Sequence, residues 1–258
     1  MSSRDPEEIW QESVEEGERR VARSVSGLAA TGFVGGLDVM LGIVGLTVVS
    51  GAFEAVLPEE SAHVIGSLAF GIGFVLLIVG RSELFTENFL VPITTVISTR
   101  RGAGAVLKLW AGTLVGNLVA LLLLAALMTQ AGLVPPSALD SASSLAETFA
   151  ERDFISALFS AIVAGALMTL LTWTAHAADD DISRIAIALL VGFLLAAPSL
   201  NHAVVSVGEM AFGLFADRGS AGWIDLLQNF PVAVLGNLIG GMALVTVMRL
   251  VQVRGEPG

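Results

Sequence analysis

The sequence predicts an all-α membrane protein with six transmembrane helices, arranged as an inverted 3+3 repeat in which the second and fifth spans are interrupted. Of its 258 residues, 54% are hydrophobic and only 14% are charged, and the mean hydropathy is +0.80. Several apolar runs approach or exceed the roughly 20 residues that a helix needs to cross a bilayer. Matching motifs and matching breaks in the two halves predict the repeat.

The first segment is predicted to be a charged helix on the membrane surface. Residues 7–25, EEIWQESVEEGERRVARSV, have a helix-forming composition with a few apolar side chains among many charges. They lack the basic start, short apolar core and small-residue cleavage site of a removable signal peptide. We therefore expect a cytoplasmic amphipathic helix at 1–23, a channel domain at 24–252 and a cytoplasmic tail at 253–258.

Six apolar segments follow, at 24–53, 64–98, 103–130, 154–176, 185–215 and 224–250. With both termini on one side, the connections on that side hold ten arginine or lysine residues, and the opposite side holds two. This bias predicts that both termini are cytoplasmic and that the chain lies in an inner or plasma membrane. The longest connection, VPPSALDSASSLAETFAERD at 134–153, is rich in proline and serine and is predicted to be a polar loop.

Polar residues interrupt the second and fifth segments, at RSELFTENFL and PSLNH. Unwound backbone is tolerated at membrane depth only where protein or a hydrated cavity satisfies it. We expect Asn88, with Pro92 in the first turn, to cap one new half-helix, and Ser199 or Asn201, after Pro198, to cap the other. The positive N-terminal ends of both half-helices would then favour an anionic ligand.

Each interrupted segment is followed by a G-N-L motif, in GTLVGNLVALLL and VAVLGNLIGGMAL. Their asparagines, Asn117 and Asn237, lie 120 residues apart, and three spans per half would make the repeat inverted. We expect these asparagines to form interhelical hydrogen bonds and the glycines to allow close helix packing. Paired broken spans of this kind point to a transport site near the middle of the bilayer.

Several classes of function are excluded. The chain has no cysteine, which excludes disulfides and thiolate metal sites, and its net charge of −11 excludes a basic nucleic-acid surface. His176 beside Asp179, Asp180 and Asp181 is interpreted as a solvated helix cap and not as a metal site. No nucleophile and base are paired in the sequence, so we predict neither an enzyme nor a bound cofactor or metal.

Four motifs in order along the chain resemble the formate/nitrite transporter family. GRSELFTEN is similar to the family's E-L-F-T-G-N loop, and LKLWAGTLVGN is similar to its third span. NHAVVS is similar to its H-x-[VI]-x-N segment, and NFPVAVLGNLIGG is similar to its last span. The resemblance implies an aquaporin-like homopentamer in which each protomer has its own pore. It also implies transport of small monovalent anions of weak acids, as the anion or together with a proton. On this resemblance the pore residues are Leu84, Phe85 and Thr86 in the loop, His202 as the central histidine, and Asn201 and Ser206 beside it.

The chain departs from the family pattern at Glu87, where the family has glycine, and at Ser206, where it has asparagine. The charged residues expected beside the pore are Asp38, Arg81, Glu83, Glu87 and Glu209. A lone charge at the bilayer centre costs about 2.5–3.5 kcal/mol, so these acids should face the interior and be paired or protonated. We predict that Glu87 is held away from the pore axis, bonded to half-helix N–H groups or paired with Arg81.

The sequence therefore predicts a membrane channel or transporter for formate-like or nitrite-like anions or their conjugate acids, with His202 as the candidate for proton coupling. A facilitator of small neutral solutes is the first alternative, because the extra acids disfavour an anion. A non-transporting membrane scaffold or sensor is the second, and the charged N-terminal helix is its support. The expected partners are a small anion or neutral solute, membrane lipid and further copies of the same chain, with no nucleic acid.

Overall fold

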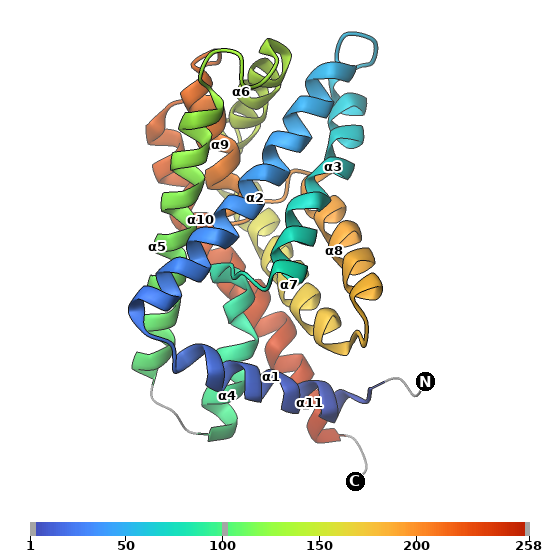
Figure 1. Cartoon of the computed structure of the whole chain (residues 1–258), viewed down its shortest axis with the longest axis vertical. Helices are drawn as coiled ribbons and strands as arrows, with labels where there is room; N and C mark the ends of the chain where they lie inside the picture. The colour runs from blue at the N-terminus through green and yellow to red at the C-terminus, as the bar shows by residue number, and fades with distance from the viewer. Residues whose placement is uncertain (1–3, 100–102, 256–258) are drawn as a thin grey trace.

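The computed structural model describes residues 4–99 and 103–255, and these residues form helices joined by short connections (Figure 1). In chain order the elements are α1 Pro6–Val21, α2 Val25–Phe53, α3 Glu59–Gly80, the short 3-10 helix η1 Phe85–Phe89, α4 Val91–Thr99, α5 Ala103–Met128, α6 Pro136–Ala150, α7 Phe154–Ala177, α8 Asp181–Ala196, α9 Val205–Ala216, α10 Trp223–Leu238, the π-helical η2 Ile239–Thr246 and α11 Val247–Gly255. The predicted all-α membrane fold is confirmed. Within the described residues, five helices are long and apolar enough to span a membrane, namely α2, α3, α5, α7 and the continuous helix at 223–255.

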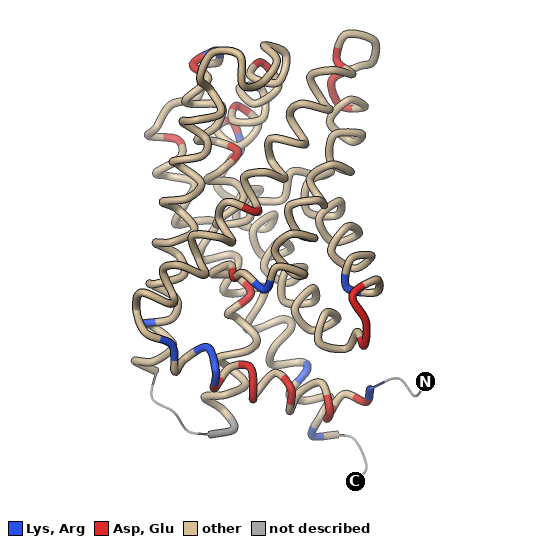
Figure 2. Tube along the Cα trace, in the orientation of Figure 1, with Lys and Arg blue, Asp and Glu red and all other residues tan. Residues whose placement is uncertain are grey.

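Helix α1 lies across one end of the molecule, beside α11, and this is called the α1 end (Figure 1). Asp5 caps α1 and forms a capping box with Glu8, which satisfies the first backbone N–H groups. Ile9, Trp10 and Val14 are buried against Trp173 of α7 and the start of α4. Most charged side chains of α1 lie on the other faces, whereas Arg20 is buried. Figure 2 shows these charges along α1, whereas the body of the molecule carries few.

The prediction of a polar loop at 134–153 is wrong, because this connection contains helix α6. Pro136 stands in the first turn of α6, where its missing N–H costs nothing, and α6 packs across the opposite end of the molecule against α9. Ala138, Ala142, Leu145 and Phe149 form its buried face. We call this end of the molecule the α6 end.

The predicted interruptions of the second and fifth spans are confirmed. Helix α3 ends at Gly80, and the chain passes through η1 before α4 begins at Val91; α8 ends at Ala196 and α9 begins at Val205. Each break contains a residue in the left-handed region at or near its start, Arg81 with φ 56° and Ser199 with φ 49°. We call residues 81–90 the first break and residues 197–204 the second break.

The two halves are built in the same way. Helix α1 packs on α4 as α6 packs on α9, and α2 packs on α5 as α7 packs on α10 and η2. In both cases glycines allow the close approach: Gly36 of α2 lies on the backbone of Asn117, and Gly165 of α7 lies on the backbone of Asn237. A side chain at either glycine would collide with that backbone, so the spacing of the helices depends on both.

The outer surface of the helices is apolar, as a lipid-facing surface requires. Among its exposed large side chains are Leu68, Ile72, Val115, Phe159, Val163 and Leu190. The predicted tail at 253–258 overlaps α11 up to Gly255, and its last three residues lie outside the described residues. Arg100 and Arg101, which contribute to the predicted charge bias, also lie outside the described residues.

Candidate pore site

Two asparagines hold the two breaks with the same set of hydrogen bonds. The Asn117 Oδ1 accepts from the Phe85 N–H at 2.9 Å, and its Nδ2 donates to the carbonyls of Glu83 at 2.9 Å and Gly32 at 2.7 Å. The Asn237 Oδ1 accepts from the Ala203 N–H at 2.8 Å. Its Nδ2 donates to the carbonyls of Asn201 at 3.0 Å and Ala161 at 2.8 Å. Each asparagine therefore connects the break of its own half to the first long helix of that half. These are interhelical hydrogen bonds of the kind that the sequence predicts for the two asparagines.

The two breaks meet at Thr86 and His202, both fully buried. The Thr86 Oγ1 lies 2.6 Å from the His202 Nε2, and the His202 Nδ1 accepts from the Val205 N–H at 3.1 Å. Because Nδ1 accepts, the hydrogen of a neutral ring lies on Nε2 and points toward Thr86. His202 is thus oriented as a hydrogen-bond donor, and a second proton on Nδ1 would face the Val205 N–H.

Aromatic side chains hold the L-F-T loop in place. The ring of Phe85 meets those of Phe89 and Trp110 edge to face, with centroids 5.0 Å and 6.0 Å away. The Trp110 Nε1 donates to the Asn88 carbonyl at 2.8 Å. Leu84 and Phe85 are both buried, and they directly precede Thr86 in the chain. Such pairs contribute about 0.5–1.5 kcal/mol each beyond their burial, so the loop has a defined position.

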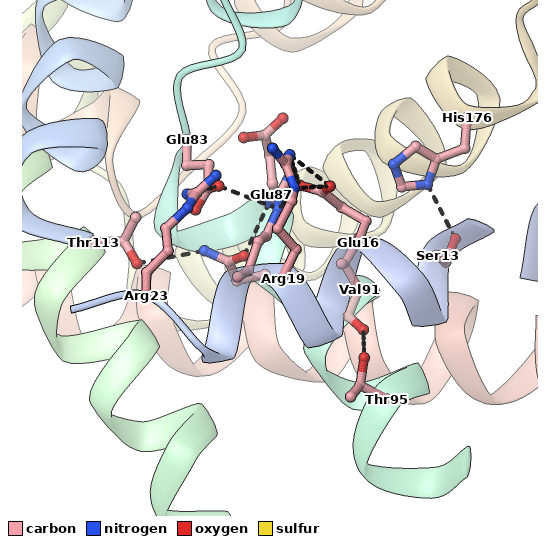
Figure 3. Close-up of polar contacts among 12 residues, drawn as sticks. Ser13, Glu16, Arg19, Arg23, Glu83, Glu87, Val91, Thr95, Thr113 and His176 are labelled. Atoms are coloured by element: carbon pink, nitrogen blue, oxygen red, sulfur yellow. Dashed lines mark hydrogen bonds and ion pairs between the residues drawn. The ribbon is translucent and has the colours of Figure 1, made fainter. Parts of the chain in front are cut away.

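Two arginines from the α1 end reach the first break, which the sequence did not predict (Figure 3). The Glu83 Oε1 is paired with Arg23 and with the Arg20 Nε at 3.3 Å, and Arg20 also donates to the Asn88 Oδ1 at 3.0 Å. Arg81, the cation expected to compensate the acids, is exposed and has no ion pair among the described residues. The pattern that could have identified this pairing is the RRVAR run at the end of the surface helix.

Arg19 and Arg20 keep Glu16 of α1 ionised. Burial raises the pKa of Glu16, but hydrogen bonds from Arg19 and the charge of Arg20 outweigh it and lower this pKa from 4.5 to about 2. The Arg19 Nε and Nη2 and the Arg20 Nε lie 2.7–2.8 Å from the Glu16 carboxylate. Burial alone would lower the pKa of Arg20, but the charges of Glu83, Glu87 and Glu16 raise it. Glu16 and Arg20 are therefore both ionised at neutral pH.

Glu87 is held by the loop and not by Arg81. Its Oε2 accepts from the Leu84 N–H at 2.9 Å, so the carboxylate closes the turn of η1 on itself. The prediction of bonding to backbone N–H groups describes this contact, although the N–H belongs to the loop and not to the half-helix. Glu87 also lines a cavity of about 330 Å³ at the α1 end, together with Arg20, Arg81 and Arg184.

The second break is held by a pair of side-chain amides, whereas the first break contains the ion pairs of Glu83. The amides of Asn201 and Asn229 bond each other reciprocally at 2.8 Å and 2.9 Å, and Asn229 also lies 3.5 Å from the Ser206 Oγ. The Ser206 Oγ donates to the His202 carbonyl at 2.9 Å. Sequence reasoning missed Asn229 and also Arg152, whose Nη1 donates to the Ser199 carbonyl at 2.9 Å.

The predicted helix caps are not formed. Asn88 donates to the Leu84 carbonyl at 3.3 Å and accepts from Arg20, so its side chain serves the first break and not the start of α4. Helix α9 begins at Val205, and its N-cap residue Val204 gives no side-chain cap. Ser199 is in the left-handed region next to Pro198, and the Asn201 amide is engaged with Asn229. The residues directly before the two half-helices, Leu90 and Val204, are apolar and cannot act as side-chain caps.

Two further acids lie inside the spans. Asp38 in α2 is half-buried and accepts from the Ser82 Oγ at 2.5 Å. Glu209 in α9 is 2% exposed, and its Oε2 has no hydrogen-bond partner among the described residues. The three aspartates that follow His176 in the sequence make separate contacts. Asp180 caps α8, Asp181 pairs with Arg184, and Asp179 pairs with Arg4. The described residues contain no group of acids and histidines suited to a metal ion.

Comparison with known proteins places the chain in its structural context. The profile of the family described as formate/nitrite transporter matches residues 7–251. The formate channel BtFdhC of Bacillus thuringiensis is 25% identical over 254 residues, covering 95% of this chain and 94% of that protein. A solved structure titled FNT family ion channel superposes with a TM-score of 0.82 at 20% identity, covering 96% of this chain and 99% of that one. A pentameric formate channel with formate bound superposes with a TM-score of 0.69 at 16% identity, covering 88% and 97%.

Proposed function

Since the chain belongs to the formate/nitrite transporter family, we propose that it is a membrane channel for small monovalent anions of weak acids, such as formate or nitrite, or for their conjugate acids. The observation that carries the proposal is the Thr86–His202 contact at the meeting point of the two breaks. An N–H donor in an apolar surrounding replaces part of the water that an anion must lose on crossing. The printed names of the relatives support the same class of substrate.

In this proposal His202 acts as a hydrogen-bond donor. When Thr86 moves away, the Nε2–H faces the path, while the Val205 N–H continues to fix the ring through Nδ1. Leu84, Phe85 and Thr86 form the constriction on the α1 side of His202, and Asn201 and Ser206 flank the histidine. The pairing of Glu83 with Arg20 and Arg23 removes one objection to an anion, because this acid carries no uncompensated charge.

We also propose the assembly and orientation that the family membership suggests: a homopentamer in a cell membrane, surrounded by lipid, with a separate pore in each protomer. The α1 end would face the cytoplasm, because the excess of arginine and lysine lies on the side of the termini. The cavity lined by Glu87, Arg20 and Arg81 would then open toward the cytoplasm.

Flux in proteoliposomes tests the proposal and separates the alternatives. We expect uptake of radiolabelled formate or nitrite above that of protein-free liposomes, and loss of this uptake in His202→Phe with normal assembly. Swelling in glycerol or urea without anion uptake would favour the facilitator of neutral solutes. Neither flux from a correctly assembled protein would favour the scaffold or sensor, and unchanged anion uptake by His202→Phe would leave the histidine a structural role.

A further inference from the structure

The last span contains a stretch of π-helix that lies against the first break. Residues Ile239–Thr246 form η2, and the Val247 N–H donates to the Met242 carbonyl, five residues earlier, as π-helical turns require. Helix α7 packs along η2, and η1 of the first break contacts it as well. Short π-helical stretches inside α-helices occur often at functional sites, so the residues of η2 are candidates for a role in the pore.

Two residues of η2 hold the end of the first break. The Thr246 Oγ1 lies 3.0 Å from the Phe89 carbonyl oxygen and 3.0 Å from the Gly241 carbonyl oxygen, and it donates its one hydrogen to this pair. Gly241 lies against the Phe89 side chain, because a Cβ at Gly241 would stand 2.8 Å from the Phe89 Cδ2 and 2.6 Å from the Thr169 Oγ1. Phe89 and Thr246 are fully buried. One hydroxyl and one missing side chain therefore fix the backbone and the ring of Phe89.

The π-helix is what brings these two residues to the same face. Thr246 follows Gly241 by five residues. In an α-helix, with 3.6 residues per turn, side chains five residues apart point about 140° away from each other. In a π-helix the residues i and i+5 are joined by a backbone hydrogen bond, so they lie one above the other. If η2 changed to α-helical turns, Thr246 would turn away from Phe89 while Gly241 stayed beside it.

The equivalent stretch of the first half is built differently. Counted from the anchor asparagine of each half, Leu121 of α5 takes the position of Gly241, and alanine, at Ala126, takes the position of the threonine. Helix α5 is α-helical over its whole length, and a Cβ at Gly208 of α9 would stand 2.8 Å from the Leu121 Cδ2. Leucine therefore fills the space beside α9, and alanine has no hydroxyl to donate. This difference between otherwise matching halves points to a task at the first break.

Phe89 connects η2 with the Thr86–His202 contact. Its ring meets the Phe85 ring edge to face at 5.0 Å and the Trp110 ring at 5.7 Å between centroids. Phe85 directly precedes Thr86, whose Oγ1 lies 2.6 Å from the His202 Nε2. Because close-packed side chains transmit displacements, a movement of Phe89 would reach Thr86 through one packed ring and one peptide bond.

We propose that Thr246 and Gly241 are positioning residues that hold the L-F-T loop in the closed position of the pore. The inference rests on the proposed function and extends it from the pore lining to the last span. While η2 is π-helical, both residues contact Phe89, and Thr86 stays on His202. When η2 changes to α-helical turns, Phe89 loses its hydrogen bond and the loop is released. Thr86 then leaves the His202 Nε2–H free for the anion.

Removal of the Thr246 hydroxyl tests the inference. Thr246→Val keeps the shape of the side chain but cannot donate, so the closed position loses one hydrogen bond. We expect formate uptake into proteoliposomes to rise about 2- to 10-fold, the equivalent of that bond, and hydrogen exchange at the first break to become faster by a similar factor. Exchange at the second break should not change. Thr246→Ser keeps the hydroxyl and should behave as the wild type in both measurements.

Two matched controls separate positioning from a general loss of stability. Thr47→Val removes a buried hydroxyl that donates within its own helix, and Gly104→Ala adds a methyl group where no described atom lies within 4 Å. Neither control should change formate uptake or exchange at the first break. Gly241→Ala, by contrast, keeps the threonine hydroxyl but displaces Phe89, and it should release the loop as the valine variant does.

The two measurements distinguish the failure of this inference from the failure of the proposed function. Unchanged or lower formate uptake by a correctly assembled Thr246→Val would overturn the inference, and so would equal loosening of both breaks. A serine variant that behaves like the valine variant would also contradict it, because the hydroxyl would then have no role. Absence of formate uptake in the wild type would instead overturn the proposed function, and exchange at the first break would still show whether Thr246 holds the loop.

Discussion

Glu87 is the residue at which this chain differs most visibly from the loop motif of its family, and the structure gives it a local task. Its carboxylate accepts from the Leu84 N–H, so it replaces the backbone freedom of a glycine with a side chain that closes the turn. We expect Glu87→Gln to preserve this contact through the amide oxygen. Glu87→Gly should expose the Leu84 N–H and speed its hydrogen exchange about 10-fold, the equivalent of one lost hydrogen bond.

Ion preference should change little in either Glu87 variant, because the carboxylate is turned toward the loop backbone. Hydrogen exchange followed by mass spectrometry measures the loop, and proteoliposome flux measures the preference. A large gain in anion conductance in both variants would instead mean that Glu87 faces the path and rejects anions.

Glu16 makes the attachment of α1 sensitive to acid. Its pKa is lowered from 4.5 to about 2 in the folded protein, so its stabilising contribution is complete above pH 4.5 and is lost as the pH falls toward 2. The shift corresponds to at most about 3 kcal/mol. Water at the membrane surface screens such a pair, which reduces this contribution to about 1–2 kcal/mol.

In detergent, the amide hydrogens of residues 6–21 should therefore exchange faster in wild type at pH 3 than at pH 6, after correction for intrinsic rates. Glu16→Gln should show the faster exchange at both values. Equal protection of wild type at pH 3 and pH 6 would show that α1 is held by its apolar face alone, through Ile9, Trp10 and Val14.

At the scale of the elements, the two anchor asparagines are equivalent and should fail equivalently. Asn117→Ala and Asn237→Ala each remove three hydrogen bonds of buried backbone groups, at a net cost of about 0.5–1.5 kcal/mol per bond. We expect each variant to lose about 2–4 kcal/mol of stability and to abolish anion flux, with the first break exposed in one and the second break exposed in the other. Thermal unfolding and hydrogen exchange at 81–90 and 197–204 measure this. A variant that loosens the opposite break would contradict the assignment of each anchor to its own half.

The elements also show what a single sequence can and cannot predict. Apolar runs and the paired breaks predicted the long helices and their interruptions, because hydrophobic length and misplaced polar residues are local signals. Helix α6 was missed because its serines and two prolines resemble a loop, and its burial depends on packing against α9. Arg20, Arg23 and Arg152 were missed because their partners lie far away in the sequence, where no periodicity relates them.

At the scale of the whole molecule, the prediction concerns the number of chains in the assembly. Native mass spectrometry of the purified protein should give about 134 kDa, five times the 26.7 kDa of one chain. The expectation rests on the likeness of this fold to the solved structure of a pentameric formate channel. A stable monomer or trimer that still transports formate would contradict the proposed pentamer.

The way each break is anchored has a consequence for biogenesis. The first break is held by Asn117 of α5, whose amide also donates to the Gly32 carbonyl of α2, so that the break and its anchor both lie within the first half of the chain. Arg20 and Arg23 are also synthesised before the Glu83 that they neutralise. During translation, the charged loop therefore meets its counter-ions at once but its amide anchor only after α5 has emerged from the ribosome. The insertion machinery must shelter this loop for the time needed to add some thirty residues, and a ribosome pause placed before Asn117 should leave the nascent chain exposed to membrane quality control.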